Sequence, residues 1–307
     1  MRFAISIPQF VADGRFDPAA FKAYMARAET LGFDSAWTQE QILGAMPHLD
    51  PIEILTYAAG CTERLRLGCA VLVTPLNSPV HLAKSLSTLD QLSRGRLEIG
   101  VGTGGRVRMF TAFGVDPSSL VGRFNEGLQV MKALWSEPRV TFQGRFWQLG
   151  GASMEPKPFQ KPWPPMWFGG SHPAALRRAV QHGDGFFGAG SQTTDQFADQ
   201  VKLIREALAS SGRDASEFRI AKRVYIAVDD DAVRGKQRIA TALDRLYGHF
   251  GQGMERVAVY GPADACAKGL SEVAEAGAEL ILLNPLFDDA EQMERLSAEV
   301  VPKLLSS

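Results

Sequence analysis

The chain has 307 residues, of which 45% are hydrophobic and 22% are charged, the ordinary composition of a globular protein. Its formal net charge of −1 gives no electrostatic attraction to nucleic acid or to an anionic membrane surface, so neither is expected as a partner. No apolar run approaches the roughly 18 residues of a membrane span, and the N-terminal run MRFAISIPQF is too short for a signal peptide, so we expect a single cytoplasmic domain over residues 1–307.

Strands and helices are predicted to alternate through the first third of the chain. The apolar run 65–73 is interrupted only by Arg66, which is typical of a strand covered on both faces. Ser78 and Pro79 fit the cap and the first position of a helix, because a proline there loses no hydrogen bond. The same patterns predict strands at 3–7, 33–37 and 97–101 and helices at 18–31, 52–61 and 79–92.

The alternation continues to the end of the chain, with an interruption after the fourth strand. Residues 105–119 are expected to form a loop, residues 140–149 (VTFQGRFWQL) a hairpin that turns at Gln143–Gly144, and the proline-rich residues 156–165 an extended connector. The other expected elements are strands at 166–168, 185–187, 218–228 and 279–283, helices near 124–135, 173–182, 194–210, 232–250 and 262–276, and a last helix with Leu296 and Val300.

Eight strands that alternate with helices predict an α/β fold, the (β/α)8 TIM barrel. Such barrels have about 250 residues, so roughly 50 residues remain for insertions. We place these insertions after the fourth strand, in residues 105–119 and 134–165. An open, doubly wound sheet remains the alternative, because periodicity alone does not separate the two folds.

In a barrel of this kind the active site forms from the loops that follow the carboxyl ends of the strands. This rule selects positions before any chemistry is considered. The selected positions are Gln9, residues 38–41, 70–74, 102–106, 169–172, 188–191 and 223–225, and Asn284.

One selected loop has the form of a phosphate site. Backbone N–H groups at a helix N-terminus, together with a hydroxyl group, bind an anion. The alternative is a plain strand-to-helix turn capped by Ser171, and His172 is either a ligand contact or an exposed residue. The loop consists of Gly169, Gly170, Ser171 and His172.

A second glycine-rich loop, residues 100–105 (GVGTGG), formally fits the dinucleotide fingerprint G-x-G-x-x-G and is similar to the nucleotide loop of S-adenosylmethionine methyltransferases. However, the motif follows the fourth predicted strand instead of the first, and no helix is expected directly behind it. We favour the interpretation that these glycines allow a flat ligand to approach the backbone closely.

No metal site and no covalent nucleophile are expected. The five histidines share no ligand spacing, and the sequence has no G-x-S-x-G motif. Cys61, Cys69 and Cys266 have unrelated spacings. Cys61 and Cys69 lie in apolar surroundings, so we expect these two to be buried thiols instead of parts of a disulfide or metal site. Glu40 is the only acid at the end of any of the first four strands; it is either a site residue or a solvated loop carboxylate.

Five stretches of the sequence follow one another in the order of a known family: residues 28–41, 63–105, 131–147, 157–186 and 279–285. On these stretches the chain resembles the bacterial luciferase-like superfamily of flavin- or F420-dependent oxidoreductases. The run LDQLSRGRLEIGVGTG is specific enough to outweigh the similarity to dinucleotide and methyltransferase motifs.

The resemblance implies a barrel, usually dimeric, that holds a flavin or deazaflavin ring at the carboxyl ends of its strands. Relatives commonly have a non-proline cis peptide against which the ring packs, and the matching pair here is Ala70–Val71. The phosphate site of the family matches residues 169–172. The other candidates for cofactor binding are Gln9, Thr103, Gly104 and Arg123.

Two positions depart from the family pattern. Many relatives have an acid followed by histidine after the second strand, whereas this chain has Glu40 and Gln41. These two remain the catalytic candidates, although a glutamine hydrogen-bonds without carrying a proton near neutral pH. In the F420-dependent glucose-6-phosphate dehydrogenases an acid follows the GVGTG run; this chain has Gly105, which argues against oxidation of a sugar phosphate.

The function expected from the resemblance is hydride transfer between coenzyme F420 and a small organic substrate, because GVGTG is closer to the F420 branch. The alternatives are an FMN-dependent monooxygenase and a non-catalytic protein that binds the cofactor. Arg106, Arg108 and residues 142–147 are expected to line the substrate mouth. A homodimer is expected through apolar positions of two helices, Leu55, Tyr57, Leu82 and Leu86.

Overall fold

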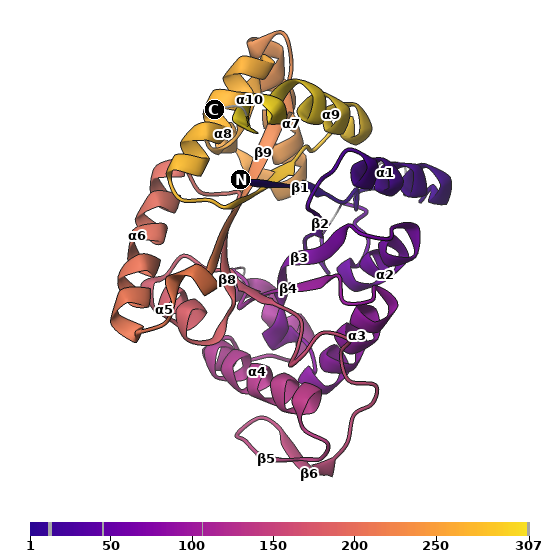
Figure 1. The fold of residues 1–307 in the computed structure, drawn as a ribbon, viewed down its shortest axis with the longest axis vertical. Coiled ribbons are helices and arrows are strands. Elements are labelled where there is room, and N and C mark those ends of the chain that lie inside the picture. Colours follow the sequence, from indigo (N-terminus) through magenta and orange to yellow (C-terminus); the bar gives the residue numbers. More distant parts are fainter. Residues whose placement is uncertain (12–13, 45, 106, 306–307) are drawn as a thin grey trace.

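The structure is a computed structural model that describes residues 1–11, 14–44, 46–105 and 107–305. Its eight central strands are parallel neighbours in one sheet, which closes because the last strand pairs with the first. This closed barrel, ringed by helices (Figure 1), confirms the predicted TIM barrel and excludes the open sheet. In spatial order its strands are β1 (Arg2–Ser6), β2 (Ser35–Thr38), β3 (Arg66–Val73), β4 (Leu97–Gly102), β7 (Met166–Phe168), β8 (Gly185–Gly188), β9 (Arg219–Val228) and β11 (Leu280–Asn284).

The helices begin where the capping residues predict. Asp17 and Ser78 accept hydrogen bonds from the first backbone N–H groups of their helices, and a proline follows each of them. The helices are α1 (Pro18–Thr30), α2 (Pro51–Cys61), α3 (Pro79–Leu92), α4 (Leu120–Ser136), α5 (Pro173–His182), α6 (Thr194–Ser211), α7 (Ala232–Tyr247), α8 (Ala263–Glu275), α9 (Asp289–Arg295) and α10 (Val301–Leu305).

Aromatic side chains fill the barrel beneath its open end. Trp37 and Trp167 are each 1% exposed and pack edge to face, with ring centroids 6.0 Å apart, and Phe187 contacts both. The buried Glu98 carboxylate accepts a hydrogen bond of 2.5 Å from Trp167 Nε1 and pairs with Arg66. These contacts join β3, β4 and β7, so the floor beneath the strand ends is rigid and packed.

The insertion after β4 lies where we predicted it, but its local structure differs in two places. Residues 107–113 and 117–119 form short 3-10 helices instead of a plain loop. In the hairpin of β5 (Val140–Gln143) and β6 (Gln148–Ala152) the turn spans residues 144–147, not Gln143–Gly144. The Glu126 carboxylate fixes this turn, because it accepts three backbone N–H groups from residues 145–147. Figure 1 shows the hairpin beyond α4, at one end of the molecule.

One strand was not predicted. β10 (Val259–Gly261) pairs in parallel with the last three residues of β9, outside the barrel. A run of three residues gives no periodic signal, so the sequence pattern does not reveal it. The preceding helix also ends earlier than expected, because α7 stops at Tyr247 and residues 248–251 form a 3-10 turn.

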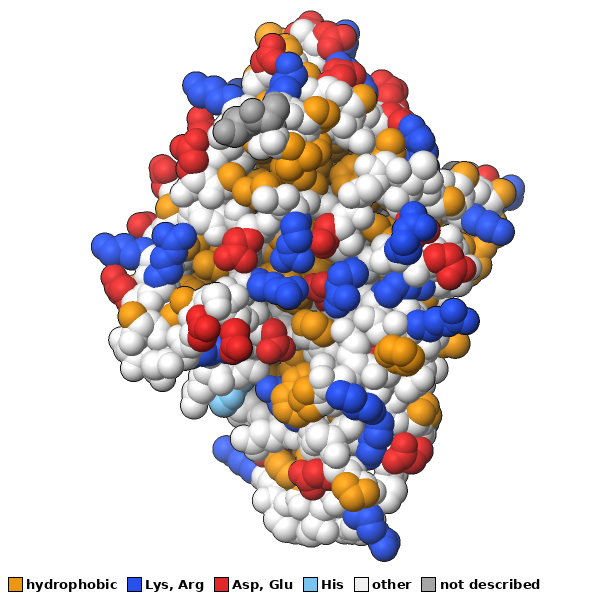
Figure 2. Space-filling model, in the orientation of Figure 1, with side chains coloured by type: hydrophobic (Ala, Val, Ile, Leu, Met, Phe, Trp, Pro, Cys, Tyr) orange, Lys and Arg blue, Asp and Glu red, His pale blue; other side chains and the backbone are white. Residues whose placement is uncertain are grey.

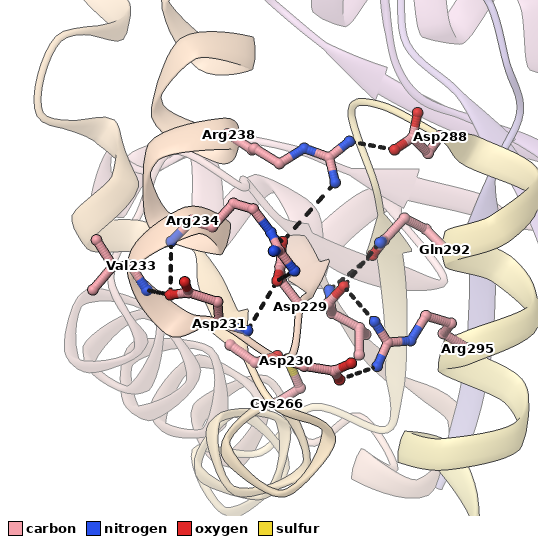
Figure 3. A network of polar contacts seen from close by, with 12 residues as sticks. Asp229, Asp230, Asp231, Val233, Arg234, Arg238, Cys266, Asp288, Gln292 and Arg295 are labelled. Atoms are coloured by element: carbon pink, nitrogen blue, oxygen red, sulfur yellow. Dashed lines mark hydrogen bonds and ion pairs between the residues drawn. The ribbon is translucent and has the colours of Figure 1, made fainter.

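The long strand β9 is tied to the C-terminal helices by a network of polar contacts (Figure 3). Gln292 on α9 brackets Val228, accepting its N–H at 2.8 Å and donating to its carbonyl at 3.0 Å. The Asp229 carboxylate accepts two hydrogen bonds from Arg234, which hold the pKa of that carboxyl below its usual range. Arg295 bonds to Asp230 at 2.6 Å. The network therefore fixes the outer end of β9 between α7 and α9.

The expected dimer face does not have the composition we predicted. Leu55, Leu82 and Leu86 are 1%, 4% and 2% exposed and belong to the core of their own chain. Only Tyr57, with 40% of its surface exposed, is available to a second copy. The helical pattern shows which positions are apolar, but it does not distinguish burial in the core from burial in an interface.

Two further observations concern the surface. On the face shown in Figure 2, basic and acidic side chains are intermixed, so that face has no extended charge of one sign. Among the helices in the described part of the chain, none combines the length and the apolar character that a membrane span requires.

Candidate active site

A cavity of about 650 Å³ opens at the carboxyl ends of the barrel strands, where barrels of this type have their sites. Its wall comes from the ends of β2, β3, β4, β7, β8 and β9 and from the loops behind them. The sequence-predicted residues that line it are Glu40, Gln41, Ala70, Val71, Thr103, Gly104, Gly169, Gly170, Ser171 and His172. The two other candidates, Gln9 and Arg123, lie outside this lining.

The wall formed by β3 has the backbone feature that the resemblance implies. The peptide bond between Ala70 and Val71 is cis, and the pairing of β3 with β4 shifts register between Cys69 and Leu72. Ala70 and Val71 both line the cavity, and Phe187 lies on the same lining. The result is an apolar surface at the floor of the site.

The glycines beside this wall make room for Val71. A Cβ atom at Gly102 would lie 2.7 Å from Val71 Cγ2, and one at Gly169 would lie 3.0 Å from Val71 Cγ1. We expected the glycines of the GVGTG run to admit a ligand to the backbone; for Gly102 the structure gives packing of the Val71 side chain as the reason. Gly104, with a φ of +74°, has the left-handed conformation that favours glycine.

The loop between β7 and α5 continues the lining beside the Val71 side chain. The cap of α5 is His172, not Ser171: His172 Nδ1 accepts the Ala174 N–H at 3.2 Å. The Ser171 hydroxyl is thus not used as the cap and lies on the cavity lining. Gly170 has a φ of +150°, and a Cβ there would lie 2.8 Å from the Ala175 Cβ. The N–H groups of the first turn of α5 are occupied, because Ala174 donates to His172 Nδ1 and Ala175 donates to the His172 carbonyl. The turn has no acidic residue, so the positive end of the helix dipole still favours an anion beside the Ser171 hydroxyl.

Glu40 is largely buried at the end of β2. Its carboxylate accepts a hydrogen bond from the Val73 backbone N–H. Burial nevertheless raises the pKa of the Glu40 carboxyl, with Asp50 adding to the effect. A buried carboxyl with a raised pKa holds its proton closer to neutral pH and is suited to donate it. Gln41 lies beside it on the same lining.

Gln9 is 3% exposed and holds the loop after β2 in place. Its Nε2 donates to the carbonyls of Gln39 and Leu49 at 3.0 and 3.1 Å, and its Oε1 accepts the Gln39 N–H at 2.7 Å. These bonds use both ends of the amide. Gln9 therefore positions Gln39, which lines the cavity, and does not line the cavity itself.

Arg123 lies under the β5–β6 hairpin. Its guanidinium carbon is 4.8 Å from the ring centre of Trp147 and 5.5 Å from that of Phe146, and its Nε donates to the Pro75 carbonyl at 3.3 Å. The hairpin residues 142–147 likewise contribute nothing to the cavity lining. Of the other residues expected at the mouth, Arg106 and the side chain of Arg108 lie outside what the structure describes.

Arg223 and Tyr247 are polar residues of the lining that were not among the predicted site residues. Arg223 on β9 donates from Nη1 to Gln39 Oε1 at 2.6 Å and lines the cavity. The strand-end rule had selected its position, but no motif assigned it a role. Tyr247, at the end of α7, reaches the cavity and shares a hydrogen bond with the Tyr225 hydroxyl. A residue at the end of a peripheral helix has no signal of this kind in the sequence.

The donor set fits a flat cofactor that carries a phosphate. Ala70, Val71 and Phe187 provide an apolar surface for a ring, and Ser171, on the same lining at the positive end of the α5 dipole, provides a hydroxyl donor for an anion. The cavity volume is in the range of small-molecule and cofactor sites. Among the described residues no group of three or more His, Cys, Asp or Glu side chains is arranged to hold a metal ion.

Comparison with known proteins gives a consistent set of similarities. The family model described as luciferase-like monooxygenase matches residues 1–280. An F420-dependent glucose-6-phosphate dehydrogenase of Kineococcus radiotolerans is 27% identical, with 94% of each chain covered. The crystal structure of monooxygenase RslO1 from Streptomyces bottropensis superposes with a TM-score of 0.85, 25% identity and 99% of each chain covered. An F420-dependent secondary alcohol dehydrogenase in complex with an F420-acetone adduct has the same fold, with a TM-score of 0.84, 19% identity, and 99% of this chain and 98% of that chain covered.

Proposed function

We propose that this chain, which belongs to the luciferase-like monooxygenase family, is an oxidoreductase that transfers hydride between coenzyme F420 and a small organic substrate. The observation that carries the proposal is the pairing, in one cavity of about 650 Å³, of an apolar wall at Ala70–Val71 with an anion site at the start of α5. The similar dehydrogenase of Kineococcus radiotolerans is named for coenzyme F420.

Each part of the lining has a task in this proposal. The cofactor, when bound, supplies the hydride chemistry. Ala70 and Val71 support the face of its ring, and Thr103 and Gly104 border the chain that leads to its phosphate. Gly169, Gly170, Ser171 and His172 form the loop that holds the phosphate at the N-terminal end of α5. The residues of the chain thus bind and orient the cofactor and exclude water from the floor of the site.

Glu40 is the proton donor that we propose for reduction of a substrate. When hydride adds to a carbonyl or an activated double bond, the product must take up a proton. Glu40 lines the cavity, and burial raises the pKa of its carboxyl. Gln41, which donates and accepts hydrogen bonds without changing charge, orients the substrate beside it.

FMN is the second candidate cofactor, and one observation favours it: RslO1, whose structure superposes on this one over 99% of each chain, is a monooxygenase. An FMN enzyme with this cavity would consume oxygen. We do not extend the sugar-phosphate substrate of the Kineococcus enzyme to this chain, because Gly105 stands where the acid of those dehydrogenases is expected.

We also propose that the protein is cytoplasmic and forms a homodimer through the surface around Tyr57 and Phe16. These two rings contact each other at 5.8 Å, and they are 40% and 37% exposed. A mass of two chains in light scattering at micromolar concentration is the expected result, and a single-chain mass would contradict the proposal.

The experiment that tests the activity is anaerobic mixing of the protein with reduced coenzyme F420 and a panel of carbonyl and enone acceptors. Oxidation of the cofactor, seen in its absorbance, is expected with at least one acceptor and not without protein. Tight binding of the cofactor without turnover across the panel would contradict the enzyme and favour the non-catalytic alternative.

A further inference from the structure

The cavity contains one buried cation that the proposed function does not use. We propose that Arg223 binds the carboxylate of the substrate, so that the protein acts on small organic acids. This inference rests on the proposed function, because the carboxylate would enter the same cavity as the cofactor.

Arg223 lies in the middle of β9 and lines the cavity. Its Nη1 donates to Gln39 Oε1 at 2.6 Å, while its Nε is buried and has no hydrogen-bond partner. The guanidinium lines both the main cavity and a smaller cavity of about 40 Å³ behind it. Because an unsatisfied buried donor is costly, an acceptor supplied from the main cavity would stabilise the group.

No carboxylate of the described residues pairs with this cation. Within 4 Å the structure gives Arg223 no ion pair, and the groups that act on it electrostatically are Tyr225, Tyr247 and Cys69, a set of phenols and a thiol. Asp289 lines the smaller cavity, but burial and Asp288 raise the pKa of its carboxyl to about 6. A carboxyl held by Arg223 would instead have a lowered pKa.

The surrounding residues keep Arg223 in place and leave one side of it open. Gln39, which accepts the hydrogen bond from Arg223, is neutral and is itself held by both ends of the Gln9 amide. A buried guanidinium that rests on a neutral, fixed partner keeps its full charge for a ligand. The structure thus has a built donor whose natural complement is an anionic oxygen pair.

The rest of the lining defines the shape of the acid. Among the described residues, Glu40 is the only acid and Arg223 the only Arg or Lys on the cavity lining, so an anion is attracted to Arg223. Ile42, Leu43 and Phe113 line the outer part of the same cavity. An acid with an apolar body of a few carbon atoms meets both requirements.

The test compares matched anionic and neutral ligands in the cofactor-loaded protein. Acetate, butyrate and benzoate are titrated by calorimetry beside acetamide, butyramide and benzamide, which have nearly the same shape. At least one acid is expected to bind tenfold or more tightly than its amide. In Arg223→Gln this preference should fall to less than twofold, in Arg223→Lys part of it should remain, and the exposed Arg139→Gln serves as the control that keeps it.

Two results would overturn the inference. The first is equal binding of every acid and its amide by the unaltered protein, a result that does not depend on the folding of any variant. The second is a loss of cofactor affinity in Arg223→Gln while the unaltered protein shows no preference for acids. Arg223 would then bind the cofactor ring and not a substrate carboxylate. The acid and amide titrations are also repeated without cofactor. Failure of the protein to bind either cofactor would then contradict the proposed function, and the role of Arg223 would still be tested by these titrations.

Discussion

Adjacent residues of β9 serve opposite faces of the barrel wall. The Arg223 side chain points into the cavity, whereas Lys222 points outward and donates from Nζ to the carbonyls of Ala189 and Gln192 at 3.1 and 2.9 Å. Ala189 and Gln192 belong to the loop after β8 that lines the cavity. On this one strand, Arg223 thus faces the proposed ligand site and Lys222 supports the neighbouring loop after β8.

The pKa of Lys222 predicts how the unfolding free energy changes with pH. Burial, with Arg223 beside it, lowers the pKa of Lys222 to about 8, so between about pH 8 and its ordinary pKa the folded state binds fewer protons than the unfolded state. The unfolding free energy should therefore rise with pH across this window, by at most about 3 kcal/mol. In Lys222→Met this rise should be absent. Urea unfolding at pH 7.5 and 10 measures the change in unfolding free energy. An equal change in the unaltered protein and in Lys222→Met would contradict the prediction.

Glu40 gives a prediction for the pH dependence of substrate reduction. Because the pKa of its carboxyl is raised, the protonated donor persists at higher pH than an exposed glutamic acid would allow. The rate should be highest below that pKa and fall as the pH rises through it. In Glu40→Gln we expect a rate lower by roughly 10²-fold and without this decline. An unchanged pH profile in the variant would exclude Glu40 as the donor, and the exposed Glu217→Gln is the control.

The sequence predicted individual site residues only where a motif or the end of a predicted strand pointed to them. Glu40 and the residues around Ala70 and Gly169 were found in this way, and they lie on one lining. The position of Arg223 was selected but its role was not, because the absence of a partner for a buried cation depends on contacts between distant strands. Tyr247 had no signal at all.

At the scale of single elements, the capping chemistry of the helices was largely readable. Ser78 caps the helix that it was predicted to cap, and Asp17 caps α1 in the same way. At α5 the cap is His172, one residue after the Ser171 that the sequence suggested. A histidine nitrogen also accepts a backbone N–H, although serine is the commoner cap. That shift matters for function, because the Ser171 hydroxyl remains available to a ligand.

The loop between β7 and α5 gives the element-scale prediction. Alanine at Gly170 would require an unfavourable φ and would place a Cβ 2.8 Å from that of Ala175, so the start of α5 must move. We expect Gly170→Ala to weaken cofactor binding by tenfold or more in a fluorescence titration. Gly150→Ala is the matched control, because that glycine is exposed and a Cβ there has open space. Equal affinities in the two variants would contradict the phosphate assignment.

At the scale of the whole molecule, the alternation of strands and helices predicted the barrel, and the structure confirms it. What the pattern did not show was the short β10, too brief to be periodic, and the distinction between core and interface at Leu55, Leu82 and Leu86. Both depend on which surfaces meet in three dimensions, and a sequence pattern records only which residues are apolar.

Glu98 joins three neighbouring strands of the barrel, β3, β4 and β7, through Arg66 and Trp167. Its carboxylate is nearly fully buried, so its removal leaves both partners unsatisfied. We expect Glu98→Ala to lower the unfolding free energy by about 3 kcal/mol or more. Glu294→Ala, which removes the exposed partner of Arg27, should lower the unfolding free energy much less, because solvent screens that ion pair. Denaturant unfolding compares the two, and similar losses would contradict this account of the floor of the site.

The most direct test of the central claim is equilibrium binding of coenzyme F420 and of FMN to the purified protein, followed by cofactor fluorescence at matched concentrations. The account predicts tight binding of F420, with weaker binding of FMN. Tight binding of FMN alone would replace the deazaflavin by the flavin and make oxygen uptake the next assay. Binding of neither would contradict the account, because the anion site at the start of α5 and the wall at Ala70–Val71 would then have no ligand in common.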